Sequence, residues 1–272
     1  MTWTCRSFKL DLTRPLVMGI VNVTPDSFSD GGLYYKPGEA VARARNCVNE
    51  GAEVIDLGGE STRPDASPIS WQHEWSRLEP VLRILARELP KTPLSIDTYH
   101  PETAERALGL GAAILNCVYP QYAAPMIDLA AETGCGLVLP CRTDADFAAI
   151  RARMSGTARA SGRAVDPSQL LIDPEIGFGT TREEDLALLG SLRRLAALAP
   201  VCVGVSRKRL VKKLTGEKTT GKNLGGCLGA AVWCALSGAS VLRVHDVRET
   251  RQALDVARAL DAGTTTGEGI RA

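Results

Sequence analysis

Several short apolar runs of this sequence end in residues that carry a charge or an amide. Asp97 follows "LSI", Asn116 follows "AAIL" and Asp173 follows "LLI". Two carboxylates and an amide match the paired donors and acceptors of a flat heterocycle with an amino-pyrimidinone edge. The N–H groups of such a ring would partner carboxylates that burial otherwise penalises. Lys208 is expected to reach the same three side chains. The competing interpretation is an internal salt bridge, such as Lys208 with Asp173.

A second set of run ends carries positive charge and suits an anion. Its members are Arg63, Arg207, Arg243 and His245. Arg243 and His245 lie two positions apart in one run, so a strand would point both to one side, and arginine binds oxyanions with paired hydrogen bonds. Asn22 ends the first run and offers a carbonyl oxygen to Mg²⁺, with water and phosphate oxygens as further ligands. Ion pairs of Arg243 and His245 with Asp246 or Glu249 are the competing interpretation.

Eight apolar runs must place these side chains. Their apolar residues are continuous rather than alternating, which is typical of parallel strands buried on both faces. The runs are 17–23, 54–60, 94–97, 112–118, 136–140, 170–177, 201–206 and 241–247. Stretches with helical spacing separate them, for example 74–90, whose large apolar residues fall on one face.

This alternation fits either an open doubly wound sheet or a closed (β/α)8 barrel of about 250 residues. The eight repeats and the chain length of 272 residues favour the barrel, and the glycine fingerprint of a dinucleotide fold is absent after the first run. In a barrel the chemistry lies at the C-terminal strand ends, where most of these runs carry polar groups. We predict an α/β protein with one (β/α)8 TIM barrel domain over 1–272 and a disordered Gly/Thr-rich tail over about 263–272.

Composition argues against several other classes of protein. The net charge of +1 gives no reason to expect nucleic acid or an anionic membrane as partner. No apolar run reaches the ~18 residues of a membrane span, and the N-terminus lacks the apolar core of a signal peptide. The eight cysteines include no C-x-x-C pair, and none has a histidine at zinc-ligand spacing. We therefore expect a cytoplasmic protein with reduced, mostly buried thiols.

Six motifs follow one another along the chain: "MGIVNVTPDSFSDGG", "IDLGGESTRP", "SIDT", "LIDPEIGFGTT", "VGVSRK" and "RVHDV". The set resembles the ordered motifs of the dihydropteroate synthases, a pterin-binding enzyme family, from about Val17 to about Ala259. The resemblance implies a barrel that is usually a homodimer and requires Mg²⁺. It also implies that 6-hydroxymethyl-7,8-dihydropterin pyrophosphate condenses with p-aminobenzoate, giving 7,8-dihydropteroate and pyrophosphate in folate biosynthesis. Sulfonamide drugs mimic p-aminobenzoate, so the chain would be a sulfonamide target.

The resemblance also assigns roles to residues of this chain. The implied pterin-binding set is Asp97, Asn116, Asp173, Phe178 and Lys208. The implied pyrophosphate-binding set is Asn22, Thr62, Arg243 and His245, with Asn22 as the metal ligand. The implied p-aminobenzoate-binding set is Phe28, Arg63, Pro64 and Ser206, with Thr62 and Phe178 beside it. The implied catalytic residues are Lys208, Asp97, Arg243 and His245, and segments 24–32 and 61–66 match loops that close over the substrates.

The implied mechanism needs no side-chain nucleophile. Pyrophosphate leaves best when Mg²⁺, arginine and histidine neutralise its charge. The carbon left behind is a cation conjugated with the pterin, and a closed loop keeps water from capturing it before the aryl amine attacks. The sequence shows no obvious Ser-His-Asp or Cys-His triad, in agreement with this chemistry.

The sequence departs from the family pattern around its fourth and fifth runs. Cys117 stands where the family usually has Asp, and Pro140 and Cys141 stand where it commonly has Met-His. The connection after the fifth run is shortened, and its helix, about 145–160, is weakly amphipathic. Cys141 is expected to be a buried structural thiol.

These changes leave two alternatives to the synthase. One is a divergent paralogue that binds pterin without synthase activity. The other is a pterin-dependent methyltransferase, which would need neither the "TPDSFSDGG" lid nor a pyrophosphate site.

Overall fold

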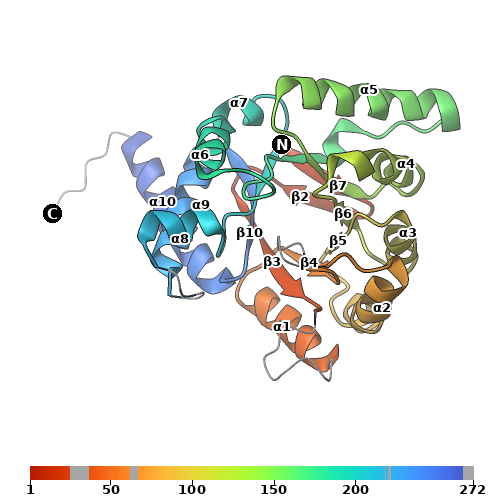
Figure 1. Cartoon of the computed structure of the whole chain (residues 1–272), viewed down its shortest axis with the longest axis horizontal. Helices are drawn as coiled ribbons and strands as arrows, with labels where there is room; N and C mark the ends of the chain where they lie inside the picture. Colours follow the sequence, from red (N-terminus) through yellow and green to blue (C-terminus); the bar gives the residue numbers. More distant parts are fainter. Residues whose placement is uncertain (25–36, 62–66, 218, 220–221, 266–272) are drawn as a thin grey trace.

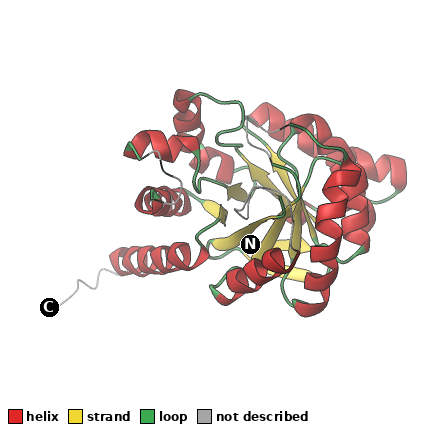
Figure 2. Cartoon of the chain, turned by 60° about the horizontal axis from the view of Figure 1, so that its bottom comes forward, coloured by secondary structure: helices red, strands yellow, loops and turns green. Residues whose placement is uncertain are grey.

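Eight parallel strands close into a barrel that helices surround (Figures 1 and 2). The computed structural model describes residues 1–24, 37–61, 67–217, 219 and 222–265. The barrel strands are β3 (Leu16–Asn22), β4 (Val54–Gly58), β5 (Leu94–Asp97), β6 (Ile114–Asn116), β7 (Gly136–Pro140), β8 (Leu170–Asp173), β9 (Val201–Val203) and β10 (Ala239–Val244). They pair in chain order, and β10 closes the ring on β3. The predicted barrel is therefore confirmed, and the open sheet is excluded.

Alternation along each strand sorts its side chains between two buried layers. Inside the barrel, the apolar layer includes Met18, Val54, Ile114, Val138, Leu171, Cys202 and Val241. The neighbouring positions, such as Val17 and Ile55, pack outward against the helices. Two residues after members of the inner layer stand Asp56, Asn116, Asp173 and Arg243. The strand period therefore directs these polar side chains into the barrel, above its apolar filling.

The surrounding helices begin and end at recognisable signals. They are α1 (Pro37–Asn49), α2 (Trp71–Glu88), α3 (Pro101–Gly109), η2 (Pro120–Tyr122), α4 (Ala123–Thr133), α5 (Asp144–Ser161), η3 (Pro167–Gln169), α6 (Arg182–Gly190), α7 (Leu192–Ala196), α8 (Arg209–Thr215), α9 (Leu224–Leu236) and α10 (Val247–Thr265). A capping box of Thr181 and Glu184 starts α6. Gly134, with φ of 71°, ends α4 in the left-handed conformation that glycine favours.

Helix α5 agrees with the modest helix predicted for about 145–160 and has one more residue at each end. Its buried side chains among the described positions include Ile150, Met154 and Thr157, which are spaced i, i+4, i+7. One narrow stripe of this kind explains the weak amphipathicity of the sequence, because most of the helix faces solvent.

An N-terminal hairpin, not predicted from the sequence, closes the lower end of the barrel. Strands β1 (Thr2–Cys5) and β2 (Phe8–Asp11) pair antiparallel. Trp3 and Cys5 are fully buried and belong to the inner apolar layer. The indole Nε1 of Trp3 donates to the carbonyl of Gln169 at 2.9 Å.

The C-terminal helix enters the segment predicted to be a disordered tail. Helix α10 ends at Thr265, so residues 263–265 are helical, and residues 266–272 lie outside the described residues. Among the described residues, no helix is both long and apolar enough to span a membrane.

Candidate active site

The inward-facing polar residues form a buried ion cluster around Arg243. Its Nε lies 2.6 Å from Asp56 Oδ2, and its Nη2 lies 2.6 Å from Asp97 Oδ2. Asn116 Nδ2 donates to the same Asp56 oxygen at 3.2 Å. Strands β4, β5, β6 and β10 thus bring one cation, two carboxylates and an amide together in the barrel interior.

Burial and mutual charge set the protonation of this cluster. Burial raises the pKa of Asp97 to about 6, and Asp56 and Asp173 add to the rise while Arg243 and Lys208 oppose it. Burial alone would lower the pKa of Arg243, but Asp56 and Asp97 hold it above its ordinary value. Arg243 therefore stays charged, whereas Asp97 titrates close to neutrality.

Two buried acceptors of this cluster have no hydrogen-bond partner among the described residues. They are Asp56 Oδ1 and Asn116 Oδ1. A buried acceptor without a donor costs free energy, about 1–3 kcal/mol for a neutral group and more for a charged one. N–H groups of a ligand ring are donors of the kind that both atoms lack.

Asp173 at the end of β8 and Lys208 beyond the end of β9 interact electrostatically with Asp97 of this cluster. Burial lowers the pKa of Lys208 to about 8, and Asp173 opposes the change. The Lys208 ammonium donates to the carbonyl of Ile176 and lies 4.5 Å from the ring centroid of Phe178. Burial raises the pKa of Asp173, whose Oδ1 accepts from the Glu175 N–H at 2.7 Å. Four of the five predicted pterin residues therefore lie close to Arg243: Asp97, Asn116, Asp173 and Lys208. The fifth, Phe178, contacts Lys208.

His245 and Ser206 meet beyond the ends of β10 and β9. His245 Nδ1 lies 3.1 Å from Ser206 Oγ, which also accepts from the His245 backbone N–H at 3.2 Å. Burial and the nearby Arg207 and Arg243 lower the pKa of His245 to about 3. The ring is therefore neutral at pH 7 in the protein alone, and its role at the pyrophosphate stays a prediction. Asp246 pairs with Arg207 at 2.6 Å, whereas the competing interpretation paired it with Arg243 or His245.

Asn22 ends β3 beside the same cluster. A Cβ atom added to Gly58 would lie 3.7 Å from Asn22 Oδ1 and 3.8 Å from Asp97 Oδ2, so the two oxygens flank this glycine. Amide and carboxylate oxygens are ligands that Mg²⁺ accepts, and Mg²⁺ usually keeps waters and phosphate oxygens. Within the described ranges, no group of three or more His, Cys, Asp or Glu side chains forms a metal site. Asn22 Oδ1 and Asp97 Oδ2 are oxygen donors of the kind that would fit Mg²⁺ bound together with a phosphate ligand.

Four predicted site residues lie outside the described residues. They are Phe28, Thr62, Arg63 and Pro64. Most of the predicted closing loops, 24–32 and 61–66, lie outside them as well.

The residues that depart from the family pattern are packed into the wall of the barrel. Cys117 and Cys141 are each 1% exposed, and burial raises the pKa of each thiol to about 12. Pro140 is the last residue of β7 and stands opposite Asp173 in the register. All eight cysteines are buried and free of disulfides, which confirms the expectation that the thiols, including Cys141, are buried.

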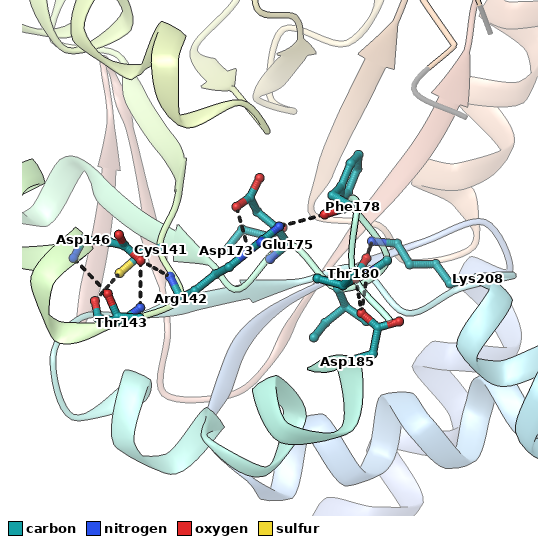
Figure 3. Close-up of polar contacts among 12 residues, drawn as sticks. Cys141, Arg142, Thr143, Asp146, Asp173, Glu175, Phe178, Thr180, Asp185 and Lys208 are labelled. Atoms are coloured by element: carbon teal, nitrogen blue, oxygen red, sulfur yellow. Dashed lines mark hydrogen bonds and ion pairs between the residues drawn. The ribbon is translucent and has the colours of Figure 1, made fainter. Parts of the chain in front are cut away.

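Sequence reasoning missed two groups of site residues. Asp56 stands inside an apolar run rather than at its end, and an acid within "VIDLG" was the signal available. Glu175 and Arg142 form an ion pair with an N–O distance of 3.1 Å beside Asp173 (Figure 3). They come from two different strand ends, and no spacing in the sequence connects them.

Comparison with known proteins places the chain in a family. The pattern of the pterin-binding enzymes matches residues 18–245. Dihydropteroate synthases of Neisseria meningitidis serogroup B and Escherichia coli are 36% and 37% identical, covering 95% and 92% of this chain and 97% and 93% of their own lengths.

Solved structures agree with these relatives. The dihydropteroate synthase of Xanthomonas albilineans with 4-aminobenzoic acid superposes with a TM-score of 0.86 at 37% identity, covering 96% of this chain and 99% of its own. The same enzyme in complex with 7,8-dihydropteroate gives 0.84 at 35% identity, with the same coverage. The chain therefore belongs to the dihydropteroate synthase family of pterin-binding enzymes.

Proposed function

We propose that this chain condenses 6-hydroxymethyl-7,8-dihydropterin pyrophosphate with p-aminobenzoate to give 7,8-dihydropteroate and pyrophosphate in folate biosynthesis. The observation that carries the proposal is the buried layer of acceptors inside the barrel, two of them unpartnered. It occurs in a chain 35% identical to an enzyme solved with 7,8-dihydropteroate. A transferase whose product carries a pterin needs such a buried layer of acceptors, which we call the floor of the site.

The pterin binds in this floor. The carboxylate of Asp173 and the side-chain oxygen of Asn116 accept hydrogen bonds from the ring N–H groups, and Asp97 holds the far edge. Lys208 donates from its ammonium to a ring acceptor, and Phe178 covers one face of the ring. Asp56 is added to this set, because its Oδ1 has no partner among the described residues.

The pyrophosphate binds at the rim above Arg243. Arg243 and Thr62 contact its oxygens, and His245 donates a hydrogen bond as a neutral ring. Asn22 holds Mg²⁺, which supplies charge neutralisation for the leaving group when it is bound. Arg243 keeps its charge at every working pH because Asp56 and Asp97 stabilise it.

The p-aminobenzoate binds beside the pterin, against Ser206, Phe28, Arg63 and Pro64. The Yersinia pestis relative was solved with a pterine-sulfa conjugate, at 30% identity to this chain. We place sulfonamides in the same part of this site, which makes the chain a sulfonamide target.

The reaction substitutes an amine for pyrophosphate at one carbon. The C–O bond breaks with its electron pair leaving on the pyrophosphate oxygen, and the lone pair of the amine forms the C–N bond. The amine nitrogen then loses a proton to water. Lys208 and Asp97 orient the pterin, while Arg243 and His245 stabilise the charge that develops on the leaving oxygen.

The assembly is a homodimer in the cytoplasm. Four large apolar side chains of α6, α8 and α9 are 41–53% exposed: Leu186, Leu214, Trp233 and Leu236. The first three also line a cavity of about 390 Å³ between these helices. A second copy of the chain would cover this apolar surface, and the free thiols suit a reducing compartment.

A turnover assay separates the synthase from its alternatives. Purified protein is incubated with the dihydropterin pyrophosphate, labelled p-aminobenzoate and Mg²⁺, with and without EDTA. Labelled dihydropteroate that disappears with EDTA supports both the reaction and the metal. Pterin binding by calorimetry without product would favour the paralogue, and product that persists in EDTA would remove Mg²⁺ from the proposal.

A further inference from the structure

Glu175 is an unusual residue at the C-terminal end of β8. It is 3% exposed, and its φ of +57° lies in the left-handed region that residues with a Cβ rarely adopt. Its Oε2 lies 3.1 Å from Arg142 Nε, as an ion pair without the alignment of a hydrogen bond. A buried acid in an unfavourable backbone conformation, paired with a cation from another strand end, indicates a specific task.

Arg142 connects this acid to the predicted pterin floor (Figure 3). Its Nη2 donates to the Phe178 carbonyl at 2.8 Å, and the Phe178 N–H donates to the Glu175 carbonyl at 3.2 Å. The Phe178 ring faces the Lys208 ammonium at 4.5 Å, and that ammonium donates to the Ile176 carbonyl. The pair therefore links the ends of β7 and β8 to the lysine beyond β9.

We propose that Arg142 and Glu175 are positioning residues for pterin binding: their ion pair fixes the 175–178 turn so that Phe178 and Lys208 face the pterin. The inference rests on the proposed function, because Phe178 and Lys208 are pterin residues only in that account. Arg142 directly follows Pro140 and Cys141, which depart from the family pattern, so this anchor comes from the same wall of the barrel.

The turn has a second anchor that does not use the pair. Asp185 Oδ1 accepts from the Gly177 N–H at 2.7 Å and from Thr180 Oγ1 at 2.5 Å. This contact holds the turn to α6 when the ion pair is removed. Loss of the pair should therefore shift Phe178 and Lys208 without unfolding the chain.

Protonation of Glu175 provides a signature of the pair. Burial raises its pKa to about 7, against the opposing charge of Arg142. The other titratable groups that face it are Asp173, Asp146, Lys208, Cys117 and Tyr119. When the pH falls through about 7, the carboxylate takes up a proton and loses its ionic attraction to Arg142. Pterin affinity should fall with it.

The test uses E175Q, R142M and the double variant of the full chain. E88Q is the matched control, because Glu88 forms an exposed ion pair with Arg45 at 2.6 Å on the outer helices. Steady-state kinetics with each substrate varied are measured from pH 6 to 8.5, and binding of the pterin pyrophosphate alone is measured by calorimetry.

We expect E175Q and R142M each to raise the KM for the pterin pyrophosphate about tenfold at pH 8, with kcat changed less than about threefold. The double variant should be no worse than either single variant, because one pair carries the effect. The pH dependence of pterin affinity near 7 should disappear in E175Q and persist in E88Q.

Unchanged pterin affinity in E175Q, or a pH dependence near 7 that survives in it, would overturn the proposal even if R142M does not fold. Wild-type protein that binds pterin without turnover would contradict the synthase proposal alone, since calorimetry still decides the role of the pair. Wild-type protein that does not bind pterin would contradict both.

Discussion

Arg243 holds two buried carboxylates, Asp56 and Asp97, at 2.6 Å each. Without this cation the two acids would repel one another in a medium that solvates charge poorly. Asp97 nevertheless retains a pKa of about 6, and Lys208 has a pKa of about 8. Between these values the floor holds an ionised acid and an ionised lysine together, which is the state that a ring with both donors and acceptors requires.

Removal of either half of the Asp173–Lys208 couple should impair the reaction strongly. We expect K208A and D173N each to lower kcat/KM by more than a hundredfold, equivalent to roughly 3 kcal/mol of transition-state stabilisation. R153A is the control, because Arg153 pairs with Asp128 on the exposed surface. Turnover of either variant close to that of the control would contradict the assignment of the floor.

The rate should depend on pH through the same groups. As the pH rises, ionisation of Asp97 and Glu175 at about 6 and about 7 should increase kcat/KM for the pterin substrate, and loss of the Lys208 proton at about 8 should decrease it. The K208R variant keeps its charge and should lose the alkaline decrease. If kcat/KM of K208R still decreases at a pH of about 8, a group other than Lys208 causes the alkaline decrease.

At the scale of elements, the ends of the apolar runs predicted several polar residues that gather inside the barrel, but they did not predict which residues pair with them. Asp97, Asn116 and Asp173 were predictable because strand ends meet at one edge of a barrel. Asp56 was missed because it lies within a run, and the Arg142–Glu175 pair because its members meet only after β7 and β8 are adjacent.

The hairpin of β1 and β2 was missed for a related reason. The alternation of buried and exposed residues in its two strands is short and partly polar. Its stability comes from packing against the end of the barrel, which the local sequence does not show. Helix α5 was predicted, but only as a weak helix, because a single stripe of buried residues is a weak periodic signal.

The hairpin should contribute substantially to stability. Trp3 is fully buried against the inner apolar layer and donates to the Gln169 carbonyl. We expect W3A to lower the free energy of unfolding by about 3–5 kcal/mol, since it leaves a cavity and an unpaired carbonyl. Urea unfolding measures the loss, with V256A as the exposed control because Val256 is 61% exposed. Equal midpoints for the two variants would show that the hairpin is only loosely attached.

At the scale of the molecule, one barrel carries both the candidate site and the apolar surface that we propose as the dimer interface. The candidate site lies at the C-terminal ends of the strands, whereas the exposed residues Leu186, Leu214, Trp233 and Leu236 belong to α6, α8 and α9. Figure 1 shows these helices outside the barrel. Assembly and chemistry should therefore be separable by mutation, apart from Lys208, which also lines the cavity between α6, α8 and α9.

The apolar surface of α9 should hold two copies together. We expect the double variant W233E/L236E to sediment as a monomer under conditions where the wild type is a dimer, because two charges would be buried without partners. R45A/E88A on the outer helices α1 and α2 is the control and should remain dimeric. A variant that stays dimeric would direct the search for the interface to another face.

The most direct test of the central claim is the stoichiometry of the reaction. Protein, Mg²⁺ and both substrates are mixed, and pyrophosphate and dihydropteroate are quantified together by mass spectrometry. The account predicts one pyrophosphate for each dihydropteroate, and no more than one pyrophosphate per protein chain when p-aminobenzoate is omitted. Sustained release of pyrophosphate without p-aminobenzoate, or pterin bound without any product, would contradict it.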